Sequence, residues 1–241
     1  MKKLLLGLVA IILVAGCTGT GTGIDTGFGN CISGCGNVIT QEFSLDEFDS
    51  ISYTTAGTLY LTRGEQFVMV EAEDNILELL SISVQNRRLK ISSDNCFITT
   101  KPIKIYISIE TLKALTSSGS GDIVSETKFD ANELSISMTG SGNVDMVADA
   151  QKINSVLTGS GNLILKGMAN EHSIVSSGSG NVKAYDLSTE RTDVKSTGSG
   201  YCEIDVSAEL DVIMSGSGNI YYTGNPVVTQ SITGSGRLIK K

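Results

Sequence analysis

Apolar and polar residues alternate in short runs over most of the chain beyond residue 38. In the second half these runs flank a recurring Gly-Ser-Gly tripeptide: Ile136 and Met138 alternate with serines before one copy, and Val144 and Met146 follow it with the same spacing. A period of two in residues rich in Ile, Val and Thr is typical of β-strands with one buried face. Each repeat is therefore predicted to be a strand, a Gly-Ser-Gly corner and a second strand.

The tripeptide recurs at a nearly constant interval. Its copies are separated by 21, 19, 19, 20, 18 and 18 residues, with first glycines at Gly119, Gly140, Gly159, Gly178, Gly198, Gly216 and Gly234. Self-similarity of this kind is typical of a solenoid, in which each repeat is one coil stacked on the last. We predict an all-β fold, a right-handed parallel β-helix (β-solenoid) with coils of about 20 residues and Gly-Ser-Gly corners. Roughly 200 folded residues would then form about ten coils.

The corners repeat their chemistry as well as their spacing. A hydroxyl residue precedes each tripeptide, and an asparagine follows most copies. Glycine is expected there because it adopts positive φ without steric cost, which lets the chain bend sharply. Side chains stacked about 4.8 Å apart are expected to form hydrogen-bonded ladders with a structural role. The predicted corner ladder consists of Gly140, Ser141, Gly142, Asn143, Gly159, Ser160, Gly161, Asn162, Gly178, Ser179, Gly180, Asn181, Gly216, Ser217, Gly218 and Asn219.

The start of the chain has the pattern of an export signal. Two lysines precede an apolar run at 4–14, and the small residues Ala15 and Gly16 lead to Cys17. The run is shorter than a membrane span, and the cysteine resembles the lipidation site of a bacterial lipobox. We predict a lipoprotein signal peptide over residues 1–16 with Cys17 lipidated. The alternative is an ordinary signal peptide with an incidental cysteine.

The rest of the chain divides by composition. Residues 17–37 are rich in Gly and Thr and have no apolar period, so they are predicted to hold the lipid anchor and a flexible tether. A single β-solenoid domain is predicted over 38–241, with irregular N-terminal coils at 38–112 and regular repeats at 113–241. The irregular part is expected to cap one end, with one helical turn within 74–80.

The charge of the chain limits its partners. Asp and Glu number 26 against 18 Lys and Arg, which gives a net charge of −8. Removal of residues 1–16 takes away two lysines, so the exported form would carry −10. An acidic protein is a poor partner for nucleic acid, and none is expected. Short basic pairs such as Arg87 and Arg88 are interpreted as solvated surface.

Five cysteines raise the question of disulfides and metals. Cys31 and Cys35 are candidates for a disulfide, either with each other or by tying down the N-terminus, and the cysteines other than Cys17 allow three connectivities. Cys202 occupies a position that is Val, Leu or Ile in other repeats, so it is interpreted as a small buried hydrophobic residue. The Cys-x3-Cys spacing is weak evidence for a metal site, so no metal and no other cofactor is expected.

Residues that carry catalysis are sparse. His172 is the only histidine, and the sequence places no partner beside it, so it is interpreted as a surface residue. Asp145 and Glu203 fall in one outward column but three coils apart, on the order of 14 Å, which is too far for a glycosidase pair. We therefore predict no catalytic residues and no enzymatic activity.

Tyrosines gather in the later coils. Alternation points Tyr222 inward and leaves Tyr185, Tyr201 and Tyr221 outward, where they form a weak candidate patch for contact with a glycan. The alternative is that these are scattered exposed aromatics with no role.

Two passages of the chain carry a family resemblance. The first runs from Phe48-Asp49-Ser50-Ile51 through Ala56-Gly57-Thr58-Leu59-Tyr60-Leu61 to Arg88-Leu89-Lys90-Ile91, and the second is the series of Gly-Ser-Gly-Asn-Val and Gly-Ser-Gly-Asn-Ile repeats. Both resemble the family of putative auto-transporter adhesin head GIN domains. Together they cover about residues 38–241. The resemblance implies a right-handed parallel β-helix in an exported, often lipid-anchored protein, and it supplies no catalytic residues to transfer.

These observations lead to one functional hypothesis and two alternatives. The first is a non-enzymatic, lipid-anchored protein of the cell envelope, at the outer membrane or cell surface, that serves as an adhesin-like or structural binding module. Its partners would be the membrane, through the anchor, and a surface glycan or an envelope protein. The alternatives are a β-helix protein that binds or cleaves polysaccharide, and a partner in envelope assembly or stress signalling.

Overall fold

A computed structural model describes residues 24–25 and 30–241 of the chain. The predicted signal peptide, the lipidation site Cys17 and most of the tether lie outside the described residues. The elements are β1 (Ile24–Asp25), β2 (Asn30–Ser33), β3 (Val38–Glu42), β4 (Ser50–Tyr53), β5 (Thr58–Arg63), β6 (Phe67–Glu73), α1 (Asp74–Leu77), β7 (Leu80–Gln85), β8 (Arg88–Ser93), β9 (Phe97–Ile98), β10 (Lys104–Ile109), β11 (Ala114–Ser117), β12 (Asp122–Ser125), β13 (Phe129–Met138), β14 (Val144–Leu157), β15 (Leu163–Ser176), β16 (Val182–Ser196), β17 (Cys202–Met214), β18 (Ile220–Thr223), β19 (Val227–Ile232) and β20 (Leu238–Lys240).

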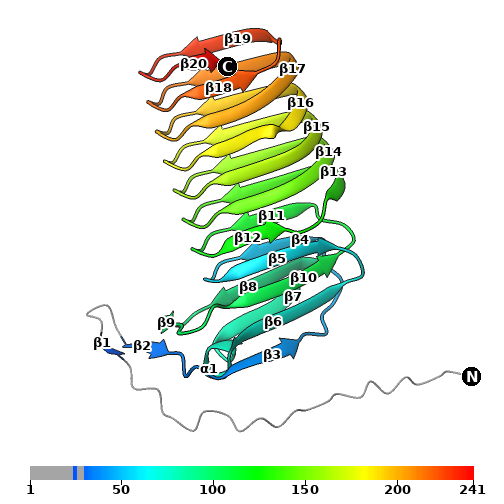
Figure 1. Cartoon of the computed structure of the whole chain (residues 1–241), viewed down its shortest axis with the longest axis vertical. Helices are drawn as coiled ribbons and strands as arrows, with labels where there is room; N and C mark the ends of the chain where they lie inside the picture. Colours follow the sequence, from blue (N-terminus) through cyan, green and yellow to red (C-terminus); the bar gives the residue numbers. More distant parts are fainter. Residues whose placement is uncertain (1–23, 26–29) are drawn as a thin grey trace, which may run out of the picture.

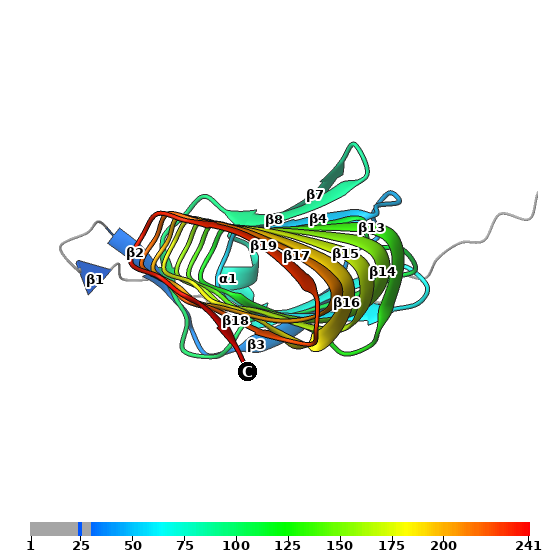
Figure 2. The same cartoon turned by 90° about the horizontal axis from the view of Figure 1, so that it is seen from above.

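Stacked coils dominate the molecule (Figure 1). Strands β13 to β17 pair in parallel and mostly in register, with irregularities where β16 pairs with β15 and with β17. The solenoid has about seven turns with a coil spacing of about 19 residues. Each coil is flattened, with the tripeptide at one narrow corner and a rounded bend at the opposite edge (Figure 2). We call the sheet formed by residues that follow each tripeptide the post-corner sheet, and the other the pre-corner sheet. The predicted β-solenoid is thus confirmed.

The core lies between the two sheets. In β14, Val144, Met146 and Ala148 point inward from the post-corner sheet, and Ile153 and Leu157 from the pre-corner sheet, all at most 1% exposed. Because successive coils are in register, equivalent apolar residues stack directly above one another. The period of two in the sequence therefore becomes one continuous hydrophobic column, which supplies the main driving force for folding.

The corners are tight because consecutive coils approach closely there. A Cβ atom added to Gly140 would lie 1.9 Å from the carbonyl oxygen of Gly119, and one added to Gly161 would lie 1.9 Å from that of Gly142. Among the described glycines, positive φ occurs only outside the tripeptides, at Gly36, Gly57, Gly167 and Gly224. The expectation that the corner glycines supply positive φ is therefore wrong. They are glycines because no side chain fits between stacked backbones.

Asparagines form a row beside these corners. Asn162 Nδ2 donates to Asn143 Oδ1 at 2.8 Å, and Asn181 Nδ2 donates to Asn162 Oδ1 at the same distance. The row begins on Asp122, whose Oδ1 accepts from Asn143 Nδ2 at 2.9 Å, and Tyr201 interrupts it. Each side chain thus links one coil to the next, as in other stacked parallel strands.

A second outer row alternates in charge. The register places Glu133, Lys152, Glu171, Arg191 and Glu209 above one another in successive coils. Lys152 and Glu171 are ion-paired at 3.3 Å, and Arg191 and Glu209 at 2.7 Å. In-register stacking brings identical positions together, so a row of one sign would repel itself, and the alternation avoids this.

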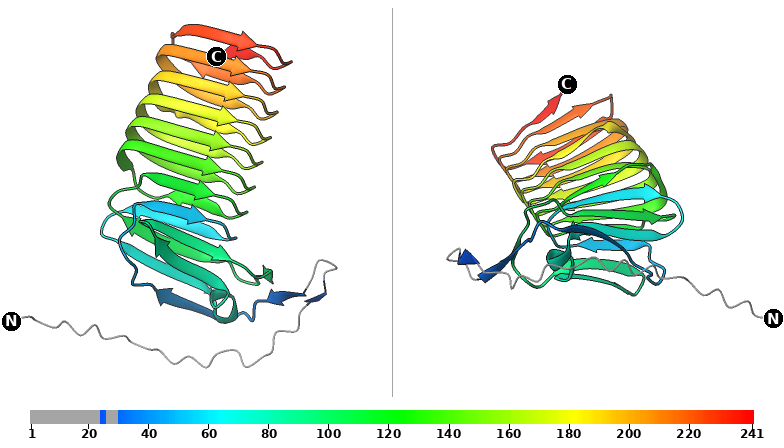
Figure 3. Two further views of the ribbon diagram at one scale, coloured as in Figure 1. Left: turned by 180° about the vertical axis from the view of Figure 1, so that it is seen from behind. Right: turned by 60° about the horizontal axis from the view of Figure 1, so that its bottom comes forward.

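The N-terminal part departs from the regular winding. Strands β4 and β5 join the solenoid in parallel through β11 and β12, whereas β3–β6, β6–β10 and β7–β8 pair antiparallel. Reversals of chain direction replace full coils over this stretch, so about seven turns form and not the ten that we predicted. The predicted helical turn is present as α1, which lies with β3 at the N-terminal end of the rod (Figure 3).

A buried carboxylate and a disulfide hold this end together. Glu73 is 1% exposed, and its carboxylate accepts hydrogen bonds from the backbone N–H groups of Gly36 at 2.6 Å and Thr100 at 2.9 Å, and from the Thr100 hydroxyl at 2.6 Å. Burial opposes ionisation, but these bonds outweigh it and lower the pKa of Glu73. Nearby, Cys31 pairs with Cys96 across a separation of 65 residues. Cys31 and Cys35 therefore do not pair with each other, because β2 lies beside β9.

Candidate functional site

The outer surface of the post-corner sheet carries the predicted tyrosine patch at its C-terminal end. The ring centroids of Tyr201 and Tyr221 lie 6.5 Å apart in an edge-on arrangement, and Lys241 Nζ lies 4.9 Å from the centroid of Tyr221. Partial burial raises the pKa of Tyr185, and the charges of Glu203 and Tyr221 act in the same direction. The three side chains are partly exposed and gather at one place, as alternation indicated.

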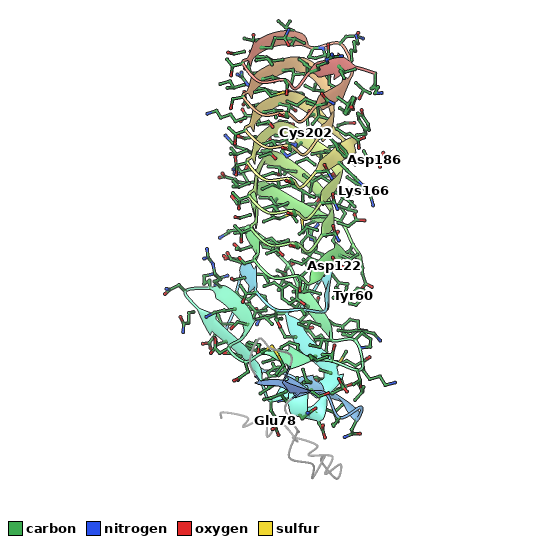
Figure 4. The ribbon with its side chains drawn as sticks, turned by 90° about the vertical axis from the view of Figure 1, so that its left-hand side faces the viewer. Tyr60, Glu78, Asp122, Lys166, Asp186 and Cys202 are labelled. Carbon is green, nitrogen blue, oxygen red and sulfur yellow. A yellow bond between two sulfur atoms is a disulfide. The ribbon has the colours of Figure 1, made fainter. Side chains whose placement is uncertain are left out.

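Sequence reasoning missed a second pair of tyrosines on the same sheet. Tyr60 in β5 and Tyr106 in β10 are partners in a parallel ladder, and their rings stack at a centroid distance of 5.2 Å. Figure 4 shows Tyr60, Asp122 and Lys166 along one side of the rod. The alternation around each tyrosine marks it as outward, but the sequence does not show that two segments 46 positions apart lie side by side.

A groove on the pre-corner side was also not apparent in the sequence. It has a volume of about 470 Å³ and is lined by Ser50, Ser52, Gln85, Asn86, Arg88 and Lys90. We call it the basic groove. Its walls come from the β7–β8 hairpin and its floor from β4. Arg87 and Arg88 are both exposed, as predicted, but their partners differ: Arg87 is ion-paired with Glu47 and Asp49, whereas Arg88 lines the groove.

Asp49 beside this groove is a fully engaged carboxylate. It accepts hydrogen bonds from the Ser50 hydroxyl at 2.9 Å and Arg87 Nε at 3.1 Å, and it is ion-paired with Lys113 at 2.9 Å. Burial opposes its ionisation, but the bonds from Lys113, Arg87 and Ser50 prevail and lower the pKa of Asp49 to about 2. This carboxylate therefore stays ionised and holds the start of β4 in place.

About half of the carboxylates of the regular solenoid are ion-paired with cations. The register places Asp145 and Glu203 three strands apart, as predicted, and Asp145 is ion-paired with Lys166 at 3.0 Å. At the rounded edge, Asp130 and Asp149 are neighbours in adjacent strands and line a groove of about 510 Å³. Asp130 is ion-paired with Arg63 and Asp149 with Lys128. A glycosidase needs two carboxyl groups that face the scissile bond, and both of these carboxylates are instead engaged by neighbouring cations.

His172 is not a surface residue, contrary to the prediction. It is 1% exposed, and its Nε2 lies 2.9 Å from the hydroxyl oxygen of Ser155, which is itself 1% exposed. Burial lowers the pKa of His172 to about 3, so the ring is neutral at physiological pH. The pair has the atoms of a Ser-His dyad but no access from solvent. In register, His172 lies between Ile153 and Thr192, so the alternation itself marks the position as inward.

Cys202 is buried, as predicted. It is 2% exposed, and burial raises the pKa of its thiol to about 12, so it remains protonated and unreactive. Over residues 24–25 and 30–241, no three His, Cys, Asp or Glu side chains lie close enough to hold a metal ion. The part of the chain that the structure describes also contains no helix long and apolar enough to cross a bilayer.

The geometry defines a class of protein: a parallel β-solenoid that displays side chains in rows on two broad sheets. The chain belongs to the family described as "Putative auto-transporter adhesin, head GIN domain", whose model matches residues 47–226. No curated protein matches the chain significantly.

Solved structures share the whole fold. A "putative adhesin" from Bacteroides fragilis has 28% identity and a TM-score of 0.83, over 87% of this chain and 100% of that one. A "putative lipid binding protein" from Parabacteroides distasonis has 26% identity and a TM-score of 0.72, over 87% and 99%. A "putative adhesin" from the same organism, at 21% identity and a TM-score of 0.73 over 87% and 99%, is similar in fold alone.

Proposed function

We propose that this protein is an exported, lipid-anchored surface protein whose solenoid is a non-enzymatic, adhesin-like binding module. The observation that carries the proposal is that one set of residues holds the coils together while another set faces solvent and varies. Inward rows, corner glycines and the asparagine row serve stacking, whereas other outward positions differ from coil to coil. Membership of an adhesin-named family supports the same conclusion.

The position of the chain ends supports an anchor at the N-terminal end of the rod. Strands β2 and β9, joined by the Cys31–Cys96 disulfide, lie at that end, and the last coil lies at the other (Figure 1). A lipid on Cys17 would hold the N-terminal end near the membrane, and the later coils would point away from it. Stable anchoring needs more than one acyl chain, as a diacylated cysteine provides.

Polysaccharide binding is the second candidate, favoured by the tyrosines of the post-corner sheet. Tyr185, Tyr201 and Tyr221 present aromatic surface together with hydroxyl groups, which suits the apolar face and polar rim of a sugar ring. Cleavage of a polysaccharide is not part of the proposal, because the neighbouring carboxylates Asp130 and Asp149 are each ion-paired.

Two measurements test the proposal. Labelling of cells with a radioactive fatty acid should mark the wild-type chain and not Cys17→Ala, and external protease should remove the labelled protein. Purified full-length protein should bind intact cells saturably, without release of new reducing ends from their polysaccharides. Release of reducing ends would refute the non-enzymatic role, and absence of all cell binding would favour a partner within the envelope instead.

A further inference from the structure

The β7–β8 hairpin stands away from the stacked coils. Its two turn residues, Asn86 and Arg87, have φ of 52° and 58°, the paired positive values of a tight hairpin turn. Strand β8 continues the pre-corner sheet, because Arg88 pairs with Ser50 and Lys90 with Ser52. Strand β7 then turns outward (Figure 2), so the hairpin and the face of β4 enclose the basic groove of about 470 Å³.

Two cations in this groove have no carboxylate partner within the described part of the chain. Arg88 and Lys90 are exposed, and neither takes part in an ion pair or a side-chain hydrogen bond there. Elsewhere on the rod, cations such as Lys104 and Lys166 are paired, with Glu71 at 2.8 Å and Asp145 at 3.0 Å. Other cations of the described residues, such as Lys183 and Lys195, also lack an ion pair, but Arg88 and Lys90 both line the same groove.

The geometry makes these charges reinforce each other. Residues two apart on a strand point to the same side, so the Cα atoms of Arg88 and Lys90 lie roughly 6–7 Å apart. The carboxylate of Asp49, the residue directly before β4, is already engaged by Ser50, Arg87 and Lys113. A concave wall with one sign of charge concentrates the field, and an anion bound between the two cations would relieve their repulsion.

The floor of the groove is small, polar and uncharged. Next to Ser50 and Ser52 the register places Ala114 and Thr116 of β11, and the adjoining strand β13 continues with Ser135 and Ser137. Gln85 and Asn86 add amide groups at the wall. Hydroxyl and amide groups pair with the hydroxyl groups of sugars, while arginine binds a carboxylate through two parallel hydrogen bonds. None of the lining residues is aromatic, so the groove lacks the stacking surface that single-stranded nucleic acid requires.

We propose that the basic groove binds an acidic polysaccharide, with Arg88 and Lys90 on the carboxylate of a uronic acid unit and the serine and amide groups on its ring hydroxyls. The inference rests on the proposed role as a binding module and names its ligand class. It also places the ligand on the pre-corner sheet, opposite the tyrosine patch.

Calorimetric titration of the purified full chain with polygalacturonate tests the proposal, with a neutral galactan as the matched probe. We expect saturable binding of polygalacturonate that weakens with added salt, and no binding of galactan. The double variant Arg88→Gln/Lys90→Gln should weaken binding at least tenfold. Both side chains are exposed, so circular dichroism and the unfolding midpoint should remain those of the wild type.

A second double variant with the same change in charge tests whether binding depends on the groove or on the positive charges of the protein in general. Lys183→Gln/Lys195→Gln removes two cations from β16, away from the groove, and should leave the affinity within twofold of wild type. Equal loss in both double variants, equal binding of galactan, or no binding of polygalacturonate would overturn the proposal. Stronger, groove-dependent binding of heparin would also overturn it, since the ligand would then carry sulfate. If cells bind Arg88→Gln/Lys90→Gln as well as they bind the wild type, the groove is not the binding site, but the proposed role of the protein as a binding module is unaffected.

Discussion

Replacement of a corner glycine by alanine should open the stack of coils. Gly159 lies in the middle of the solenoid, and a Cβ atom there would lie 1.9 Å from the carbonyl oxygen of Gly140. Ordinary contact requires at least 3.4 Å, so the two coils must separate locally by about 1.5 Å, roughly a third of the strand spacing. The hydrogen bond from Ser160 N to Gly140 O, now 3.1 Å, would then be lost.

The magnitude follows from these losses. The backbone bond and the neighbouring Asn162–Asn143 bond each contribute about 1 kcal/mol, and the remaining overpacking strain costs about 1–3 kcal/mol. We expect Gly159→Ala to lower the free energy of unfolding by about 3–5 kcal/mol, and the thermal midpoint by about 10 °C. Urea and thermal unfolding followed by far-ultraviolet circular dichroism measure both quantities.

Two variants serve as controls for the steric effect at Gly159. Ser160→Ala changes the exposed residue of the same corner and should alter stability by at most about 0.5 kcal/mol. Gly36→Ala places a side chain where φ is 84° and the nearest atom is 3.9 Å away, so it isolates the cost of positive φ, about 1 kcal/mol. If Gly159→Ala proves no more costly than these two, close approach of backbones is not the reason for the tripeptide.

Three further predictions concern buried and paired charges. The pKa of His172 is about 3 in the fold and 6.5 when unperturbed, so only the unfolded state gains a proton between these two pH values. The free energy of unfolding should therefore fall by about 1.4 kcal/mol for each pH unit below 6.5. Urea unfolding at pH 7, 6 and 5 measures this loss, which should be absent in His172→Leu. Glu171→Lys puts three cations in succession with Lys152 and Arg191 and should cost about 1 kcal/mol, with partial recovery in 0.5 M salt; an unchanged midpoint at low salt would contradict the role of the row. Glu73→Gln should lower the free energy of unfolding by about 2–4 kcal/mol and speed amide hydrogen exchange near residue 36. Because the pKa of Glu73 is lowered in the fold, its contribution to stability should be full above its unfolded pKa and decline as the pH falls below that value. Equal exchange protection in the variant and the wild type would show that Glu73 does not hold this segment.

The alternation of apolar and polar residues predicts which side chains of the candidate sites face outward, but it does not always predict which of them lie together. The outward tyrosines of the later coils fall in consecutive repeats, so their meeting follows from the period. The stacked pair Tyr60–Tyr106 and the groove around Arg88 and Lys90 join segments without a common period. His172 shows a different error: the alternation that assigns Ile153 and Thr192 to the interior applies equally to the histidine, and its polar character misled the interpretation.

The regular solenoid follows from the amino-acid sequence alone, because a fixed period sets which residue of the next coil each residue will contact. The asparagine row, the inward apolar columns and Cys202 all follow from that one rule. The arrangement of the N-terminal end is visible only in the folded protein, in the Cys31–Cys96 pairing, the burial of Glu73 and the outward turn of the β7–β8 hairpin. These contacts join residues tens of positions apart in aperiodic segments, where the partner is set by how the chain reverses direction and not by any repeat.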